Sequence, residues 1–396
     1  MTKKPSYRFA GYTESWEQRK LGEISSRVKG NDGRMDLPTL TISAGQGWLD
    51  QRERFSGNIA GKEQKNYTLL RKGELSYNHG NSKLAKYGVV FQLNNYTEAL
   101  VPKVYHSFKM IDGRSGTFFE YLFATKIPDR ELGKLVSSGA RMDGLLNITY
   151  DDFMSIKLTF PTLPEQTAIG SFFQDIDQLI SLQQRKLEVL KEQKKTYLKL
   201  LFPAKGQTKP ALRFAGFEDE WKEVKLGEIA DYKNGKGYED RQSDSGSYEL
   251  INLNSISIDG GLKRSGKFID KVDETLEKGD LVMVLSDVAH GNLLGRVAII
   301  PESNKFVLNQ RVALLRPRLN SNSEFLYSYI NSNQYYFKAQ GAGMSQLNIS
   351  RSSVENFSVY FPSLPEQEAI GAFFQDLDKA IAKQEEKVNQ LKESKQ

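Results

Sequence analysis

The side chains that most often carry out enzyme chemistry are scarce in this sequence. Cysteine is absent, and the three histidines stand far apart at His79, His106 and His290. Thiolate zinc sites, cysteine nucleophiles and disulfides are therefore excluded, and no metal site or catalytic triad is evident among three separated histidines. His79 and His290 each precede Gly-Asn, which favours a structural turn, with a base or phosphate contact from these loops as the alternative.

Closely spaced carboxylates do not predict a catalytic pair either. Asp175 with Asp177, and Asp376 with Asp378, are two residues apart in segments with a helical pattern. Residues two apart on a helix point in nearly opposite directions, so neither pair can share a metal ion or a proton. We interpret both pairs as solvated faces.

Several enzyme motifs are missing. No Pro-Pro dipeptide occurs, so the [ND]PP[FYW] segment of amino-methylating enzymes is absent, and no G-x-x-x-x-G-K-[ST] phosphate loop is present. Asp129, Glu131 and Lys134 have the wrong spacing for a nuclease cluster, and a helical surface explains them better. The sequence therefore encodes none of these enzyme classes, and an enzyme that acts alone is the least favoured function.

Length and charge limit the remaining possibilities. The 396 residues are enough for two domains, and no run approaches the roughly 20 apolar residues that span a bilayer, which predicts a cytoplasmic protein without a membrane partner. Residues 1–160 carry 24 Lys and Arg against 17 Asp and Glu, whereas residues 214–360 carry 17 against 20. If both halves bind a polyanion, the second half needs a local basic patch, for which Lys263, Arg264 and Lys267 are candidates.

An internal duplication is the strongest signal in the chain. Residues 160–181, FPTLPEQTAIGSFFQDIDQLIS, and 361–382, FPSLPEQEAIGAFFQDLDKAIA, are identical at 15 of 22 positions, and residues 5–24 and 210–229 form a second related pair of blocks. The segments between the blocks differ. One frame therefore carries two polar surfaces, which favours two recognition modules of unlike specificity over a duplicated structural domain that drifted. We divide the chain into modules at 1–159 and 206–360, a helix with linker at 160–205, and a second helix at 361–396.

Each LPEQ block is expected to open a long helix. Pro164 and Pro365 suit a first helical turn, and Glu165 and Glu366 suit its positive end. Apolar residues then recur at alternating steps of four and three, which predicts a coiled-coil seam between the two helices. The first helix, of about 37 residues, would be roughly 55 Å long. The seam positions are Ile169, Phe173, Ile176, Ile180, Gln183, Leu187 and Leu190 in the first helix, and Ile370, Phe374, Leu377, Ile381, Gln384, Val388 and Leu391 in the second.

One polar residue occupies the same seam position in each helix. Gln183 and Gln384 either form a buried pair that fixes the register or extend to solvent at the edge of the bundle. The circular order of the repeat blocks also predicts that the two ends of the chain lie close together.

The chain consists of a variable module, an LPEQxxI helix, a second variable module and a second LPEQxxI helix, and each module opens with RFAG…W…KLGEI. This order resembles the DNA-specificity subunit of type I restriction-modification systems over nearly the whole chain. The resemblance implies a mixed α/β (α+β) fold with a pseudo-two-fold repeat. Two globular target recognition domains would be joined by two long antiparallel helices forming a coiled coil. Each domain would read one half of a bipartite asymmetric site, and the helices would set the spacer and dock the methyltransferase subunits.

The resemblance also implies which molecules bind this chain. The expected partners are double-stranded DNA, two modification (methyltransferase) subunits and two restriction (ATP-dependent translocase and nuclease) subunits. No cofactor is expected on this chain; the complex would use S-adenosylmethionine, ATP and Mg²⁺ through its partner subunits. A two-armed adaptor whose modules bind proteins remains the alternative. The second helix stops at Gln396, short of a counterpart to Tyr197–Phe202.

Arg, Asn and Gln read base edges, while phosphates accept hydrogen bonds from any nearby donor. Strand-like runs at 88–91, 281–285 and 296–300 alternate with loops rich in such residues, and we expect the loops to contact DNA. The candidates are Gln46, Arg52, Arg54, Tyr77, Asn78, Asn81 and Lys83 in the first module, and Lys236, Tyr238, Asn292, Asn309, Gln310 and Arg311 in the second.

Overall fold

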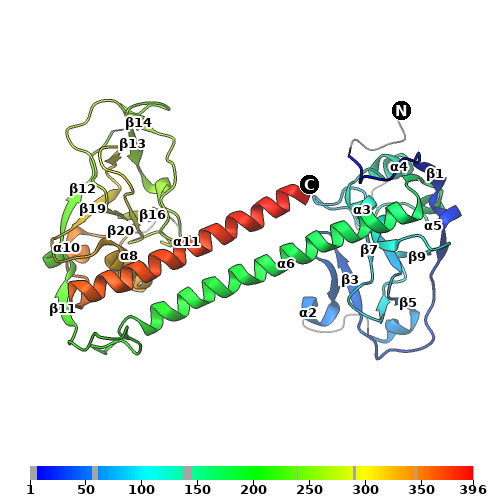
Figure 1. Cartoon of the computed structure of the whole chain (residues 1–396), viewed down its shortest axis with the longest axis horizontal. Coiled ribbons are helices and arrows are strands. Elements are labelled where there is room, and N and C mark those ends of the chain that lie inside the picture. Colours follow the sequence, from blue (N-terminus) through cyan, green and yellow to red (C-terminus); the bar gives the residue numbers. More distant parts are fainter. Residues whose placement is uncertain are drawn as a thin grey trace. The chain divides into compact units, whose positions relative to one another are not determined.

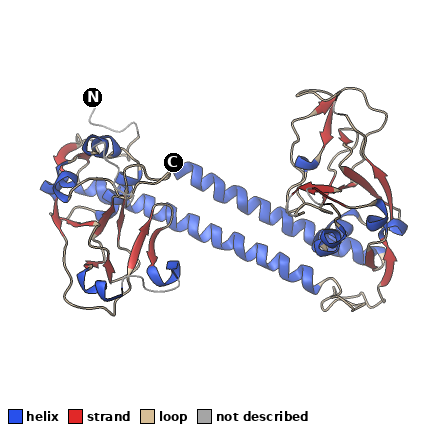
Figure 2. Cartoon of the chain, turned by 180° about the vertical axis from the view of Figure 1, so that it is seen from behind, coloured by secondary structure: helices blue, strands red, loops and turns tan. Residues whose placement is uncertain are grey.

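The computed structural model describes residues 7–55, 61–136, 145–238, 240–288, 291–343 and 346–395. The chain divides into two compact units: unit 1 comprises Met1–Ser181 with Ser394–Gln396, and unit 2 comprises Leu182–Glu393. In each unit, strands and short helices gather around the start of a long helix (Figures 1 and 2). This mixture of helices and strands, with a long helix after each module, confirms the predicted fold class. The block boundaries at 159/160, 205/206 and 360/361 stay a prediction.

Unit 1 is built on a four-stranded antiparallel sheet in the order β2-β9-β6-β7. Its strands are β1 (Glu17–Lys20), β2 (Ser25–Arg27), β3 (Leu40–Ser43), β4 (Gly47–Asp50), β5 (Thr68–Arg71), β6 (Leu75–Asn78), β7 (Val89–Gln92), β8 (Glu98–Val101), β9 (His106–Met110) and β10 (Lys157–Phe160). Its helices are α1 (Leu21–Ile24), α2 (Gln51–Phe55), the 3₁₀ helix η1 (Gly61–Asn66), α3 (Gly116–Ala124), α4 (Asp129–Leu135), α5 (Tyr150–Ser155) and the first half of α6 (Leu163–Leu200).

Unit 2 has a matching four-stranded antiparallel sheet in the order β12-β19-β15-β17. Its strands are β11 (Lys222–Lys225), β12 (Ala230–Asn234), β13 (Tyr248–Ile251), β14 (Phe268–Ile269), β15 (Leu281–Val284), β16 (Ser286–Val288), β17 (Val297–Ile299), β18 (Phe306–Leu308), β19 (Val312–Pro317), β20 (Gln346–Asn348) and β21 (Ser358–Phe361). Its helices are the second half of α6, α7 (Leu226–Ile229), the 3₁₀ helix η2 (Leu253–Ser255), α8 (Ser323–Ser332), α9 (Gln334–Gln340), α10 (Arg351–Glu355) and α11 (Leu364–Lys395).

The two units share one frame. β1 pairs with β10 and β11 pairs with β21 in the same antiparallel register, with Phe160 and Phe361 at matching positions. The expected runs at 88–91, 281–285 and 296–300 form β7, β15 and β17. The aromatic core of unit 1 centres on Phe119, Phe153 and Phe160, whereas that of unit 2 contains Phe325 and Phe337 together with residues from the end of α6 and the start of α11.

The LPEQ block fixes the start of each long helix to its module. In unit 1, the Arg8 guanidinium donates two hydrogen bonds of 2.6 Å to the buried Glu165 carboxylate. In unit 2, Arg213 does the same to Glu366 at 2.8 and 2.7 Å. The glutamates were expected only to complement the helix dipole. They are instead the acceptors of buried bidentate pairs, and Trp221 Nε1 adds a third donor to Glu366 at 3.1 Å.

The glutamine of each LPEQ block joins the start of its long helix to the start of a short helix of the same unit. Gln367 Nε2 donates to the Pro362 carbonyl at 2.9 Å, and Gln367 Oε1 accepts from the backbone N–H of Asn322 at 3.0 Å. Asn322 is the N-cap of α8, so this one side chain joins the starts of α8 and α11. Gln166 makes the same two bonds in unit 1, to Pro161 and to the N-cap of α3.

The second half of α6 runs antiparallel to α11 within unit 2. Gln384 Nε2 donates to Gln183 Oε1 and to the Gln183 carbonyl, both at 2.9 Å, and Gln384 is 6% exposed. Of the two alternatives, the structure therefore shows the buried pair. None of the fourteen seam positions is exposed, whereas the intervening Leu182 and Val189 are 58% and 51% exposed.

The interpretation of both aspartate pairs as solvated faces is wrong for one member of each. In unit 2, Asp378 Oδ1 lies 2.5 Å from the ammonium of Lys194. In unit 1, its counterpart Asp177 is paired with Lys395 and accepts a hydrogen bond from the Tyr121 hydroxyl at 2.8 Å. The interpretation considered each helix alone. Lysines on the other helical segment pair with these two aspartates, and this explains why they are not free in solvent. The other two aspartates, Asp175 and Asp376, are exposed.

Residues near both ends of the chain contact α6 within unit 1. The ring of Phe9 packs edge-on against Phe172 with centroids 5.4 Å apart, and Lys395 pairs with Asp177 five residues further along the helix. Five helical residues span about 8 Å along the axis, which agrees with the expected proximity of the two ends. Phe202, expected in the linker, is a core residue whose ring stacks on Phe374 with centroids 5.7 Å apart.

Candidate nucleic-acid interface

Unit 2 contains a hollow of about 470 Å³ with a largely polar lining. It forms where the end of β12, the turn between β18 and β19, the strands β16 and β20, and the start of α10 meet. Two of the predicted residues, Gln310 and Arg311, line it. The polar groups that sequence reasoning missed are Asn234, Ser286, Gln346, Asn348 and Arg351. Amide and guanidinium groups are the ones that form bidentate hydrogen bonds with base edges.

A glycine lets the walls of this hollow approach each other. Gly235 follows β12, and its N–H donates to the Val312 carbonyl at 3.1 Å. A Cβ at this position would lie 1.9 Å from the Asn309 carbonyl oxygen, so no other residue fits without moving the backbone. The close approach places the turn that carries Gln310 and Arg311 against the end of β12.

Hydrogen bonds hold the amide lining in place. β16 and β20 pair so that Ser286 lies opposite Asn348, and the Ser286 hydroxyl donates to Asn348 Oδ1 at 2.8 Å. Gln346 Nε2 donates in turn to the Ser286 hydroxyl oxygen. Because these side chains are held by one another, they present a preorganised set of donors and acceptors.

A second, smaller hollow in unit 2 contains the predicted residue Asn292. It measures about 210 Å³ and is also lined by Arg296, Gln334, Tyr335 and Lys338. Arg296 Nη1 donates to the Asn331 carbonyl at 3.1 Å, and burial lowers the pKa of this guanidinium. Among the described residues, Arg296 Nε has no hydrogen-bond partner. Asn292 Oδ1 accepts a hydrogen bond from Lys338 Nζ at 3.3 Å.

In unit 1, five of the predicted residues lie on exposed turns or on a short helix. Gln46 lies in the turn between β3 and β4, Arg52 and Arg54 lie on α2, and Asn81 and Lys83 lie in the loop after β6. The β3–β4 turn and the loop after β6 are neighbours, because a Cβ on Gly45 would contact the Leu84 side chain at 3.3 Å.

Two predicted contacts are wrong because the side chains are core residues. Tyr77 is fully buried, stacks on Phe153 with centroids 4.2 Å apart, and donates its hydroxyl to the Tyr87 carbonyl at 2.7 Å. Tyr238 is 6% exposed and packs with Leu250, Ile269 and Val307. Neither ring is accessible to a DNA duplex.

Three further candidates are already engaged with other groups of the chain. Asn78 Oδ1 accepts from the Gly80 N–H at 3.1 Å, and Asn78 Nδ2 donates to the Ile42 carbonyl at 3.3 Å. Lys236 is exposed but paired with Asp273 at 2.9 Å. Asn309 is half-buried, and its Oδ1 accepts from the Arg311 N–H at 3.4 Å.

The histidines support a structural role where they are described. His79 is 5% exposed, and its ring lies 4.7 Å from that of His106, centroid to centroid. His106 Nε2 lies 2.9 Å from the Ile148 carbonyl oxygen, and burial lowers the pKa of this imidazole. His290 lies outside the described residues. The His79 ring thus packs in the core, which favours the structural role for this histidine, whereas Asn81 in the same loop is exposed.

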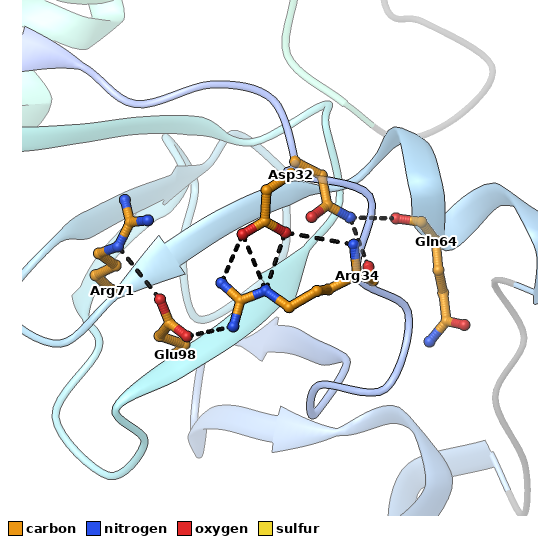
Figure 3. Close-up of polar contacts among 6 residues, drawn as sticks. Asp32, Arg34, Gln64, Arg71 and Glu98 are labelled. Carbon is orange, nitrogen blue, oxygen red and sulfur yellow. Dashed lines mark hydrogen bonds and ion pairs between the residues drawn. The ribbon is translucent and has the colours of Figure 1, made fainter.

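Part of the positive charge of unit 1 is neutralised locally. Figure 3 shows Arg34 between two carboxylates: its Nε lies 2.9 Å from Asp32 Oδ2, and its Nη1 lies 2.7 Å from Glu98 Oε2. Arg71 shares Glu98 at 3.3 Å, and Arg34 holds the pKa of both carboxyl groups below their usual values. This network fixes the loop before β3 to the β5–β8 pair, so these arginines serve the fold of unit 1.

In unit 2, Lys267 of the suggested basic patch pairs with Asp244 at 2.6 Å, whereas Lys263 and Arg264 are exposed.

Among the described residues, no group of three or more His, Asp or Glu side chains is arranged to hold a metal ion. None of the described helices has both the length and the apolar character needed to cross a membrane. What the two hollows of unit 2 offer chemically is hydrogen bonding and positive charge.

Comparisons with known proteins agree with the internal repeat. The family model described as "Type I restriction modification DNA specificity domain" matches the chain twice, at residues 13–192 and 218–393. The type I restriction enzyme MjaVIII specificity subunit of Methanocaldococcus jannaschii is 23% identical over 279 residues, which cover 66% of this chain and 64% of that protein. The match therefore spans slightly less than two thirds of this relative.

Two solved structures have the same fold. The S subunit of a type I restriction-modification system from M. genitalium superposes with a TM-score of 0.60 at 15% identity, covering 98% of this chain and 95% of that one. A chain from a structure described as showing complex assembly and conformational transition of the type I R-M system gives a TM-score of 0.54 at 15% identity, covering 99% and 97%.

Proposed function

Because the chain belongs to the family of the type I restriction modification DNA specificity domain, we propose that it is the non-catalytic DNA-recognition and assembly subunit of a type I restriction-modification complex. Each unit reads one half of a bipartite, asymmetric DNA site. The helices α6 and α11 set the spacing between the half-sites and dock the methyltransferase subunits. Cofactor chemistry, with S-adenosylmethionine, ATP and Mg²⁺, belongs to the partner subunits.

The observation that carries this proposal is one frame with two different polar surfaces. Strand order, the register of the β1–β10 and β11–β21 pairs, and the Arg–Glu anchors are the same in both units. The loops that emerge from this frame differ: Gln310, Arg311 and Gln346 line the hollow of unit 2, whereas Gln46, Asn81 and Lys83 lie on the exposed loops of unit 1. Different loops on a common frame are what two readers of unlike sequences need.

Methylome sequencing tests the proposal directly. Cells carrying this gene together with genes for its partner subunits are compared with cells that lack only this gene. Loss of a single split, asymmetric methylation motif on deletion is the expected result. An unchanged methylome would contradict DNA recognition and favour an adaptor whose units bind proteins.

A substitution in the hollow of unit 2 tests DNA recognition separately from assembly of the complex. Arg311→Ala, in the hollow of unit 2, is expected to change or relax one half of the methylated motif and to leave the other half unaltered, since a good bidentate base contact discriminates by about 1–3 kcal/mol. The exposed Arg318, which pairs with Asp231, provides the matched control: Arg318→Ala should leave the motif as it is.

A further inference from the structure

In both units an arginine lies over the ring of a tyrosine, but the two residue types come from opposite elements of the shared frame. In unit 1, Arg27 lies over the ring of Tyr150, with its Cζ 4.1 Å from the ring centroid. In unit 2, Arg351 lies over the ring of Tyr232 at 5.2 Å. Arg27 and Tyr232 are each the third residue after a repeated Leu-Gly-Glu-Ile, and Tyr150 and Arg351 each follow Leu-Asn-Ile and a hydroxyl residue.

The shared frame shows that the exchanged residues occupy equivalent positions. Arg27 faces Phe108 across the β2–β9 pair, and Tyr232 faces Leu315 across the matching β12–β19 pair. Tyr150 and Arg351 are the first residues of α5 and α10, whose N-caps, Thr149 and Ser350, accept a hydrogen bond from the N–H three residues on. Both units therefore have an arginine and a tyrosine at this place. The position that carries the arginine in one unit carries the tyrosine in the other.

In unit 2 the pair lies at the candidate interface, and in unit 1 its arginine is exposed. Tyr232 and Arg351 both line the hollow that contains Gln310 and Arg311, the side chain of Arg351 is 61% exposed, and Arg27 is exposed. A guanidinium stacked on a ring keeps its N–H groups free at the edge of the stack. Arg27 makes no side-chain hydrogen bond or ion pair with any described residue. Arg351 shares Glu355 through its Nε and Nη2, which leaves Nη1 as a donor.

We propose that the stacked Arg–Tyr pair of each unit is a common anchor for the DNA backbone, in which Arg27 in unit 1 and Arg351 in unit 2 each bind a phosphate of the duplex. The inference rests on the proposed function and assigns roles within it. Phosphates are the same in every sequence, so an anchor for them keeps its chemistry in both units. Base-reading residues must differ between units that read different sequences, as Gln310, Arg311 and Gln346 do.

The test measures binding of the full chain to two labelled duplexes by fluorescence anisotropy over a range of salt concentrations. One duplex carries the site found in the methylome, and the other is unrelated. Arg351→Ala and Arg27→Ala are each expected to weaken binding to both duplexes about tenfold, to lower the salt slope by about one, and to leave the ratio of the two affinities unchanged. Arg311→Ala is expected to lower that ratio, and Arg318→Ala to change nothing.

An exchange variant tests the role of the pair itself. Tyr232→Arg combined with Arg351→Tyr gives unit 2 the arrangement of unit 1, and its affinities are expected within about twofold of the parent. Melting curves identify any variant that fails to fold, and Arg27→Ala then tests the inference independently in unit 1. Folded alanine variants that bind like the parent, or that alter the ratio of affinities, would overturn the anchor role. Failure of the unaltered chain to prefer its site would instead overturn the proposed function.

Discussion

Glu366 is the buried carboxylate on which the start of α11 depends. It is 1% exposed and accepts two hydrogen bonds from Arg213 and one from Trp221. Removing one partner of a buried ion pair leaves a charge without compensation, so Glu366→Gln is expected to lower the free energy of unfolding of unit 2 by about 3 kcal/mol. Urea denaturation followed by tryptophan fluorescence measures the effect, because Trp221 is the one tryptophan of the sequence within unit 2. Glu368→Gln, an exposed change two residues away, should stay within about 0.5 kcal/mol of the parent.

Glu120 makes the stability of unit 1 depend on pH. Burial raises its pKa to about 7, from an unfolded value near 4.5, and Asn94, Asp177 and Lys395 face its carboxyl group. A raised carboxyl pKa means that its contribution is fully present below pH 4.5 and is lost as pH rises through 7, a loss of about 3 kcal/mol. Glu120→Gln should therefore melt like the parent at pH 4 and at a higher temperature than the parent at pH 8. Equal melting temperatures at pH 8 would contradict this assignment, and the exposed Glu53→Gln should follow the parent at both pH values.

Single residues were the least predictable part of the candidate site. Gln310 and Arg311 were predicted because a turn rich in donors between two strands is a local pattern. Tyr77 was misassigned because its burial depends on Phe153, a ring 76 residues further along the chain. Gln346 was missed for the same reason, since only its pairing with the distant Ser286 brings it to the hollow. The repeated Leu-Asn-Ile beside it was the available signal.

At the scale of elements, Gly371 shows how closely a short helix approaches a long one. A Cβ added there would lie 2.6 Å from Asn322 Oδ1 and 3.0 Å from the Phe325 nitrogen, at the start of α8. Gly371→Ala is expected to cost about 2 kcal/mol, because overpacking exceeds the gain of about 1 kcal/mol in helix propensity. Hydrogen exchange of α8, measured by mass spectrometry, should quicken.

The counterpart glycine in unit 1 provides the comparison. At Gly170 the added Cβ would meet Phe118 N at 3.2 Å and Ser115 Oγ at 3.3 Å, contacts that small shifts can relieve. Gly170→Ala should therefore cost less than Gly371→Ala. The reverse order would mean that these distances do not decide the cost.

The long helices were predictable because their pattern is periodic and local. The Gln183–Gln384 pair was left open because pairing depends on a second segment. The sequence did contain a further signal: in each helix an aspartate stands six residues before the seam glutamine and a lysine eleven after it. This repeated placing of opposite charges allows each aspartate to pair with the other helix's lysine in an antiparallel arrangement, as Asp378 and Lys194 do in unit 2, but it does not fix the register.

At the scale of the whole molecule, the proposed spacer role predicts a change in DNA specificity without a change in the bases read. Inserting seven residues next to Gln183 and seven next to Gln384 preserves the heptad pattern on both sides. It lengthens the helices by about 10 Å, or about three base pairs of duplex. The methylated motif should keep both half-sites and gain about three unread positions. An unchanged gap in a folded variant, or altered half-sites, would show that the helices do not set the spacing.

The anchors described for Arg8 with Glu165, and for Arg213 with Glu366, have a consequence for how such a gene diverges. The side chains that anchor each long helix to its module lie in the repeated blocks, and those that line the hollow of unit 2 lie between these blocks. Mutations of exposed lining residues such as Gln310 and Arg311 can thus accumulate with little loss of folding free energy. A lineage can acquire a new target by drift in its loops and still inherit a foldable protein at every step.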